Sequence, residues 1–321
     1  MRRRVLSLTL MAAVLSAWSG EPDLSGCFPP AIKTVGVVMP ASILKQKSFD
    51  AGIRALEKAG YRVKKAQRLS FDKLAPLKDR VSDFEEMWLD PEVDLVLCAR
   101  GGEGAEAVVR QLDWQKLARR PDQRVLGFSN ITMILNAMLR KGVGHPFSGP
   151  SISQMLYCKG DTLEWLCKSL AGKPLPATQL RPLKPGPFSG LPCGGHIHYV
   201  SMGARNGWGA DMRGRVVFLE RNNSATLEGI RQELDAIAES GALEKAAGVI
   251  FGDVTPAVTR HKGLADQVAQ TNNVDEVKRA FANKMKCPVY DGYAYGHIPV
   301  SHAIDFRREV QVSENGLMTW K

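Results

Sequence analysis

Three polar side chains in this chain of 321 residues have the types that acyl-transfer chemistry needs, and each lies at the carboxyl end of an apolar run: Ser129, Glu220 and His297. In an open α/β sheet the carboxyl ends of the strands form the ligand-binding edge, so folding can bring distant residues together there. A serine, a carboxylate and an imidazole then supply a nucleophile, an orienting acid and a base.

Ser129 lies in the segment Leu126–Thr132, between a short apolar run and a second run at 131–139. This order predicts a strand, a tight turn and a helix. The hydroxyl would lie at the helix N-terminus, where free N–H groups favour developing negative charge. An N-cap serine fits the same position. Glu220 in a surface ion pair and His297 in an ordinary loop are equally simple interpretations, so spacing alone leaves the set open.

A glycine-rich turn, Arg100–Gly104, follows the apolar run Val93–Ala99. Glycines at such a place let backbone N–H groups face a ligand, as an anion-binding nest or an oxyanion hole. A plain tight turn between a strand and a helix explains the same residues. The spacing lacks one glycine of the GxGxxG pattern, which disfavours a dinucleotide cofactor.

Neither a metal site nor a nucleic-acid site is predicted. His196 and His198 would face one side of a strand, but no third ligand is evident. The net charge of +10 fits anionic partners, yet there is no basic run with interleaved aromatic residues and no zinc-finger spacing. The six cysteines have irregular spacing and no CxxC, so we expect buried thiols and at most one disulfide.

The first 27 residues have the pattern of an export leader. Arg2–Arg4 form a positive region, and Val5–Trp18 form an apolar region too short to span a bilayer. Small residues at 17–19 suit cleavage by a signal peptidase. The segment 24–27 offers a lipoprotein anchor at Cys27 as an alternative, and an unprocessed chain is a third. We therefore expect a periplasmic or exported protein and exclude residues 1–27 from the predicted fold.

Apolar runs alternate with segments of helical spacing through residues 28–172. Continuous apolar runs at 34–39 and 93–99 are typical of buried parallel strands. We expect an α/β domain, with a parallel sheet and helices on both faces. Pro and Gly gather in residues 173–190, which predicts an interdomain linker. Residues 191–321 then form a second domain that carries the acid and the base.

Several spaced motifs resemble the LD-carboxypeptidase family, in the family's order and from Ile32 to Val312. They lie at residues 90–102, 127–132, 194–196, 217–220, 248–252 and 292–297. The family comprises murein tetrapeptide carboxypeptidases and related enzymes that inactivate microcin-type peptide–nucleotide antibiotics.

The resemblance implies a cofactor-free serine peptidase with a Ser-Glu-His triad. Ser129 would be the nucleophile, Glu220 the orienting acid and His297 the base. The backbone N–H groups of Asn130 and of the Gly101-Gly102 turn would form the oxyanion hole. The resemblance also implies an N-terminal domain like the class I glutamine amidotransferases, a smaller β-rich C-terminal domain, and a homodimer.

Four positions depart from the family's pattern, and one of them is Ser148, which begins Ser-Gly-Pro where the family commonly has His-Gly-Pro. The other three lie in or next to the motifs named above. Asn130 stands where the family usually has Asp, Glu103 where it has Tyr, and His196 where it has Asn after the double glycine. Because the oxyanion donor at position 130 is a backbone N–H, an asparagine can still supply it. The contributions of Glu103 and His196 to specificity stay open.

The expected function is an exported LD-carboxypeptidase that removes the terminal D-alanine of a peptidoglycan stem tetrapeptide through an acyl-enzyme. A microcin-type hydrolase of the same family is the first alternative. Its nucleotide would stack on Trp208, although a packed turn tryptophan is the favoured interpretation of that residue. A periplasmic solute-binding protein, also with a leader and two α/β lobes, is the alternative from another class.

Overall fold

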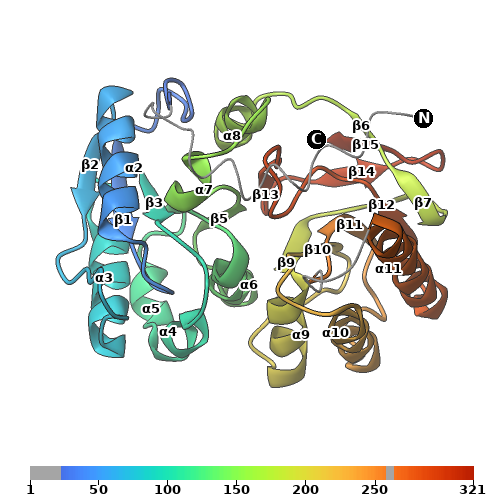
Figure 1. Cartoon of the computed structure of the whole chain (residues 1–321). Coiled ribbons are helices and arrows are strands. Elements are labelled where there is room, and N and C mark those ends of the chain that lie inside the picture. Colours follow the sequence, from blue (N-terminus) through green and yellow to red (C-terminus); the bar gives the residue numbers. More distant parts are fainter. Residues whose placement is uncertain (1–22, 258–263) are drawn as a thin grey trace.

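The computed structural model describes residues 23–257 and 264–321, with side chains described everywhere in these ranges except 264–272. The chain folds into two halves that lie side by side, each built around its own sheet (Figure 1). A third, smaller sheet lies above the helices of the second half in the same view.

The first half contains a six-stranded sheet in the order β13-β5-β4-β3-β1-β2. Five of its strands are parallel to one another, and they are β1 (Thr34–Val38), β2 (Arg62–Lys65), β3 (Leu95–Cys98), β4 (Arg124–Gly127) and β5 (His145–Ser148). The inner strands β1 and β3 are buried along their whole length, as expected for a sheet covered on both faces. The edge strand β2 is basic and partly exposed, which protects an open edge from pairing with another chain.

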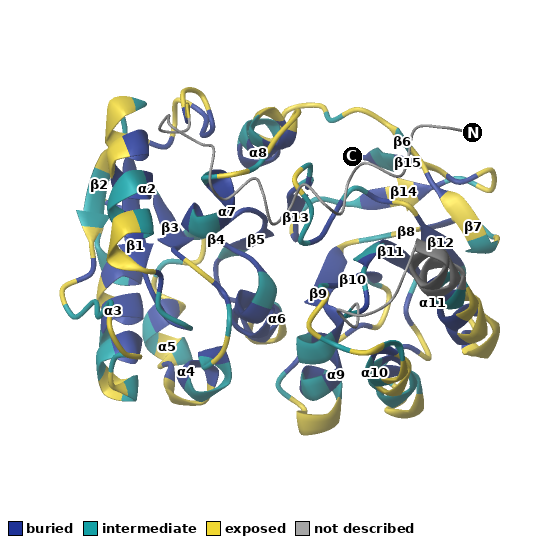
Figure 2. Ribbon diagram, viewed as in Figure 1, coloured by how far each residue is buried: buried dark blue, intermediate teal, exposed yellow. Residues whose placement is uncertain are grey.

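Helices connect these parallel strands, as the sequence predicts. They are α2 (Gln46–Lys58), α3 (Leu77–Leu89), α4 (Ala105–Gln111), α5 (Trp114–Leu117) and α6 (Thr132–Lys141). Two further helices, α7 (Ile152–Met155) and α8 (Thr162–Leu170), follow β5. Figure 2 shows the central strands buried and the outward faces of the helices exposed. The predicted α/β class with a parallel sheet is confirmed, and the likeness to glutamine amidotransferases stays a prediction.

The second half contains a five-stranded sheet in the order β7-β12-β11-β10-β9. Four of the strands are parallel, and they are β9 (Pro192–His196), β10 (Val216–Arg221), β11 (Gly248–Val254) and β12 (Val289–Asp291). Successive residues of β10 point into different cores, because side chains alternate along a strand. One face packs against α9 (Ile197–Asn206), α10 (Leu227–Glu239) and α11 (Leu264–Lys284).

Residues 173–190, predicted as a linker, belong instead to the C-terminal sheets. They contain β6 (Thr178–Gln179), β7 (Arg181–Lys184) and β8 (Phe188–Gly190). β7 pairs antiparallel with β12 at a sheet edge, where a strand tolerates proline. β6 and β8 flank β14 (Val310–Val312) and β15 (Leu317–Trp320) in the third sheet, which is antiparallel. The Pro and Gly content concealed short strands whose partners lie far away in the sequence.

Segments at both ends of the chain pack differently from the predicted division into a leader and two domains. β13 (Ile304–Asp305) returns to the first sheet and pairs antiparallel with β5. Leu24 and Cys27, assigned above to the leader, are buried in the core of the first half. Residues 1–22 lie outside the described residues.

All six cysteines are free in the structure, so the single disulfide allowed by the sequence does not occur here.

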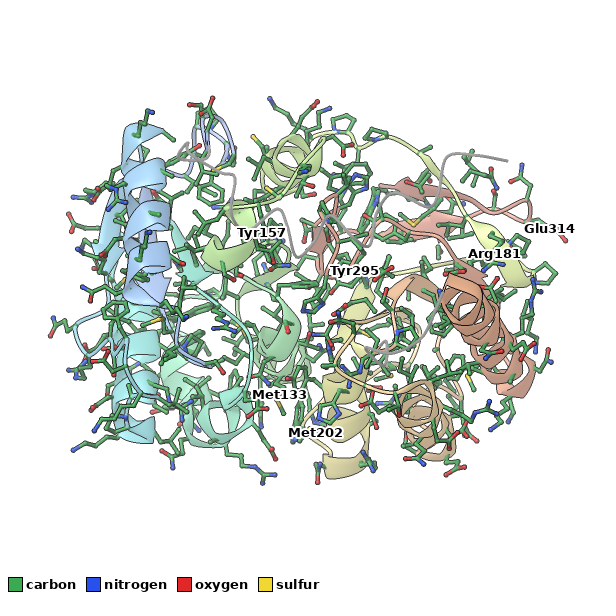
Figure 3. The ribbon with its side chains drawn as sticks, in the orientation of Figure 1. Met133, Tyr157, Arg181, Met202, Tyr295 and Glu314 are labelled. Atoms are coloured by element: carbon green, nitrogen blue, oxygen red, sulfur yellow. The ribbon has the colours of Figure 1, made fainter. Side chains whose placement is uncertain are left out.

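The two halves share one continuous hydrophobic core that extends from the first sheet to the inner face of the second. Met133 of α6 and Met202 of α9 lie on facing sides of this junction (Figure 3). Buried hydrogen bonds cross it. The amide of Asn136 on α6 donates to Gly194 O at 2.8 Å and accepts from Gly194 N at 3.0 Å.

Asn136→Ala would leave a buried N–H and a buried C=O of Gly194 without partners. We expect the free energy of unfolding to fall by about 3 kcal/mol, measured by urea denaturation. The matched control is Asn206→Ala, because Asn206 is exposed and makes only a bond to the carbonyl four residues earlier. An equal loss in the two variants would contradict the importance of the contact across the junction.

Candidate active site

The turn after β4 places Ser129 in a strained backbone conformation. Its φ is +61°, and it is the one non-glycine residue of the described chain with a positive φ. Such a conformation has a cost for any residue with a Cβ, and it is typical of nucleophiles on a strand-to-helix turn. A 3-10 turn, η2 (Ser129–Ile131), follows and leads into α6. The predicted strand, turn and helix are therefore present, and the serine is not an ordinary cap.

Glu220 and His297 form a hydrogen-bonded pair in the second half. Glu220 lies in β10, and His297 lies in the loop after β12. The distance from His297 Nδ1 to Glu220 Oε2 is 2.9 Å, with the glutamate side chain 0% exposed and the histidine side chain 24% exposed. Since Nδ1 faces the carboxylate, Nε2 is the nitrogen left for a second partner.

The junction brings this pair against the Ser129 turn. The ring of His297 packs on Phe128, the residue before Ser129, with centroids 4.7 Å apart. Phe128 also packs on Tyr295, whose hydroxyl contacts Ser148 Oγ at 2.7 Å. Figure 3 shows Tyr295 at the centre of the molecule, between the two halves. The Glu220–His297 pair of the second half thus lies against the residue that precedes Ser129 in the first half.

The electrostatics of Glu220 follow from its burial. Burial raises the pKa of the Glu220 carboxyl, and the neighbouring His297 acts in the opposite direction. Glu220 Oε1 has no hydrogen-bond partner in the described chain. Because an isolated buried carboxylate is unfavourable, its charge favours the imidazolium form of His297 when a proton arrives there.

The glycine turn lies directly against Ser129. A Cβ on Gly101 would stand 2.7 Å from Ser129 Cβ and 3.0 Å from the backbone nitrogen of Asn130. Gly102 has a φ of +99°, and a Cβ there would stand 2.3 Å from Ser42 Oγ. Only glycine fits both positions. The structure therefore brings together the three residues predicted to form an oxyanion hole.

Asn130 has a structural explanation that the sequence could not provide. Its side chain is buried, and Oδ1 accepts a hydrogen bond of 2.9 Å from the backbone N–H of Ala105, at the start of α4. Nδ2 lies 3.4 Å from Met133 Sδ. The amide is buried here without a charge, and its own backbone N–H stays at the N-terminus of η2, where no intrahelical acceptor exists.

His196 and His198 do not lie on one strand, so that expectation is wrong. β9 ends at His196 and α9 begins at Ile197. His198 Nδ1 contacts Glu233 at 2.8 Å, whereas His196 is buried with its ring 5.6 Å from that of His297. Burial, and then the charge of Arg221, lower the pKa of His196, so its ring is neutral. No cluster of three or more metal-binding side chains occurs in the described part of the chain.

The sequence did not predict the side chains that contact the site residues and hold them in place. Arg221, next to Glu220, is buried and forms a two-pronged ion pair with Glu233, with contacts of 2.8 and 3.0 Å. Tyr199 on α9 donates a hydrogen bond to Gly102 O at 2.6 Å. Two features of the sequence could have indicated such supporting residues. One is Arg221, directly after the predicted acid, and the other is Asn136, a polar residue inside the apolar α6. Glu103 is exposed at the edge of the glycine turn.

The comparisons with known proteins agree with this geometry. The family model described as the LD-carboxypeptidase N-terminal domain matches residues 35–149, and the model of the LD-carboxypeptidase C-terminal domain matches residues 189–312. The chain belongs to the LD-carboxypeptidase family.

Relatives and solved structures cover most of the chain. "Probable murein peptide carboxypeptidase" of Bacillus subtilis is 28% identical over 84% of this chain and 86% of its own length. The microcin C7 self-immunity protein MccF of Escherichia coli is 22% identical over 88% of this chain and 92% of its own. The crystal structure of muramoyltetrapeptide carboxypeptidase from Oxalobacter formigenes has the same fold, with a TM-score of 0.72, 20% identity, and coverage of 89% of this chain and 97% of that one.

Glu220→Gln removes the buried negative charge and keeps the shape of the side chain. Burial raises the pKa of Glu220, so the folded state loses stability when this carboxyl becomes charged. The loss of stability is complete at any pH above the raised pKa. The penalty disappears as the pH falls below the ordinary value of a glutamate. We expect the variant to melt at or above the wild-type temperature at neutral pH, with a difference that shrinks towards acid.

Melting curves from about pH 4 to pH 8 measure this difference across the titration range of a glutamate. Glu103→Gln is the matched control, because that carboxylate is exposed. A Glu220→Gln protein that is destabilised equally at every pH would contradict this account of the charge.

Proposed function

We propose that this protein is an exported serine LD-carboxypeptidase that removes the terminal D-alanine from peptidoglycan stem tetrapeptides. The observation that carries the proposal is the strained Ser129 beside the buried Glu220–His297 pair, in a chain of this family. The name of the Bacillus subtilis relative, which gives a murein peptide as substrate, supports the substrate class.

In the proposed reaction, His297 Nε2 takes the proton of Ser129 Oγ while the oxygen bonds to the carbonyl carbon of the diamino acid. The carbonyl electrons move to its oxygen, which faces the N–H groups of Gly101, Gly102 and Asn130. His297 then gives the proton to the nitrogen of D-alanine as the C–N bond breaks and an ester remains on Ser129. Water, deprotonated by His297, attacks this ester. His297 returns the proton to Ser129 Oγ as the ester C–O bond breaks and the shortened peptide leaves.

Glu220 keeps the imidazole oriented during both steps. The hydrogen bond to Nδ1 fixes the tautomer that leaves Nε2 free to accept the serine proton. Each proton transfer makes His297 cationic next to a buried anion, which stabilises the charge-separated state. The whole sequence needs no metal and no organic cofactor.

We infer export from the leader pattern, with cleavage near residues 17–19. The buried state of Leu24 and Cys27 favours this form over a lipoprotein, because a lipid on the Cys27 thiol would force that side chain out of the core. Burial also raises the pKa of Cys27 to about 12, so the thiol has little thiolate character. A homodimer, as the family resemblance implies, remains part of the proposal.

A microcin-type peptide–nucleotide hydrolase is the second candidate, since the Escherichia coli relative named for microcin self-immunity aligns with most of the chain. Trp208, the expected stacking residue, argues against it. Trp208 packs beside Arg140 and Trp114 around a cavity of about 250 Å³. This cavity lies at the C-terminal end of the ten-residue helix α6, about 15 Å from the N-terminal end that follows Ser129.

The proposal is tested by incubating purified protein with a disaccharide tetrapeptide and recording the loss of one alanine by mass spectrometry. We expect wild-type turnover, and a decrease of at least about 10³-fold in Ser129→Ala and in His297→Ala. The same samples are offered an aspartyl-nucleotide mimic. Cleavage of the mimic without cleavage of the tetrapeptide would favour the second candidate.

Ser82→Ala on α3 is a control for a serine far from the site and should retain full turnover. Near-normal alanine release by a folded Ser129→Ala protein would contradict the serine mechanism. Tight peptide binding without turnover by the wild type would favour a solute-binding protein instead.

A further inference from the structure

We propose that Tyr199, from the second half of the chain, is a positioning residue for the oxyanion hole that the first half supplies. The inference rests on the proposed function and adds a residue to it. Its basis is one short contact across the junction, in which the phenol O–H of Tyr199 donates to the carbonyl oxygen of Gly102 at 2.6 Å.

Ser42 holds the same turn from the other side. Its backbone N–H donates to Gly101 O at 3.2 Å, and its Oγ accepts from the backbone N–H of Glu103 at 2.8 Å. The peptide between Gly102 and Glu103 is therefore fixed at both ends, by Tyr199 at the carbonyl and by Ser42 at the N–H. The peptide before it is fixed at its carbonyl alone.

That arrangement leaves two backbone donors of the turn available, at Gly101 and Gly102. A trans peptide directs its N–H opposite to its C=O, so the Gly102 N–H points away from Ser42, which binds the Gly101 carbonyl. Neither Gly101 nor Gly102 donates its N–H to an acceptor in the described chain. Gly101 also lies against Ser129 and the backbone nitrogen of Asn130. The turn therefore offers fixed, unpaired donors next to the nucleophile, as stabilisation of an oxyanion requires.

The position of Tyr199 links this turn to the base. It is the third residue of α9, which begins directly after His196. Its ring packs on His196 with centroids 4.8 Å apart, and His196 in turn packs on His297 at 5.6 Å. One short segment of the second half thus contacts both the oxyanion turn and the imidazole. Burial raises the pKa of Tyr199, so the phenol keeps the proton that it donates.

Tyr199→Phe removes the hydroxyl and keeps the ring. We expect kcat for alanine release to fall about tenfold with KM unchanged, because a loosened donor affects the transition state and not the bound substrate. Tyr61→Phe is the matched control, since the Tyr61 hydroxyl also donates to a backbone carbonyl, Phe28 O at 3.0 Å, outside the site. This control should keep the wild-type kcat.

A second readout separates positioning from a general effect on folding. A peptide boronic acid with the stem sequence forms a tetrahedral adduct on Ser129 and places an oxygen in the oxyanion hole. We expect Tyr199→Phe to weaken its binding about tenfold. Binding of the intact tetrapeptide to the double variant Ser129→Ala/Tyr199→Phe should match that to Ser129→Ala alone.

Ser42→Ala tests the same turn from the opposite side. If both residues fix one peptide, kcat of the double variant Ser42→Ala/Tyr199→Phe should exceed the value expected from multiplying the two separate losses. Wild-type kcat and boronate affinity in Tyr199→Phe would overturn the inference, as would an effect on KM alone. An inactive wild-type protein would instead contradict the proposed function itself.

Discussion

The buried hydrogen bond between Glu220 and His297 is the interaction on which the rest of the site depends. A carboxylate that is 0% exposed has no water to stabilise it, and its bond to the imidazole is 2.9 Å long. Because the charge must be compensated inside the protein, the position of His297 is fixed within narrow limits. The packing of Phe128 against the imidazole, with centroids 4.7 Å apart, also helps to keep the ring there.

The same constraint explains why the two halves must meet so closely. The nucleophile turn and the glycine turn come from the first half, whereas the acid and the base come from the second. Neither half is a complete site. The junction is accordingly rich in directional contacts, such as the pair of bonds between Asn136 and Gly194, and these fix the relative position of the halves more closely than apolar packing alone.

The sequence predicted the parts of the structure that depend on local patterns. Continuous apolar runs identified the parallel strands, and the order of strand, turn and helix placed Ser129 correctly. It could not predict the strands in 173–190, because their partners lie far away in the sequence and their Pro and Gly content is typical of loops. The prediction that His196 and His198 lie on one strand was wrong for a related reason. Two residues cannot show whether the sequence period is that of a strand or of a helix.

The residues that support the site could not be predicted from local sequence patterns either. The bond from Tyr199 to Gly102 and that from Glu103 to Ser42 exist only once the chain has folded. For Asn130, the sequence could show only that the backbone N–H stays available in spite of the departure from the family's pattern. The structure gives its side chain a structural role, because the buried amide oxygen accepts a hydrogen bond from the first N–H of α4.

Covalent labelling by a fluorophosphonate tests the central claim most directly, because the reagent modifies a serine only when a base activates it. Intact-mass measurement and peptide mapping of the labelled protein identify the modified residue and its rate. The account predicts a single adduct on Ser129, with labelling slowed by at least about 10²-fold in His297→Ala. An adduct on another residue, or an unchanged rate without His297, would contradict it.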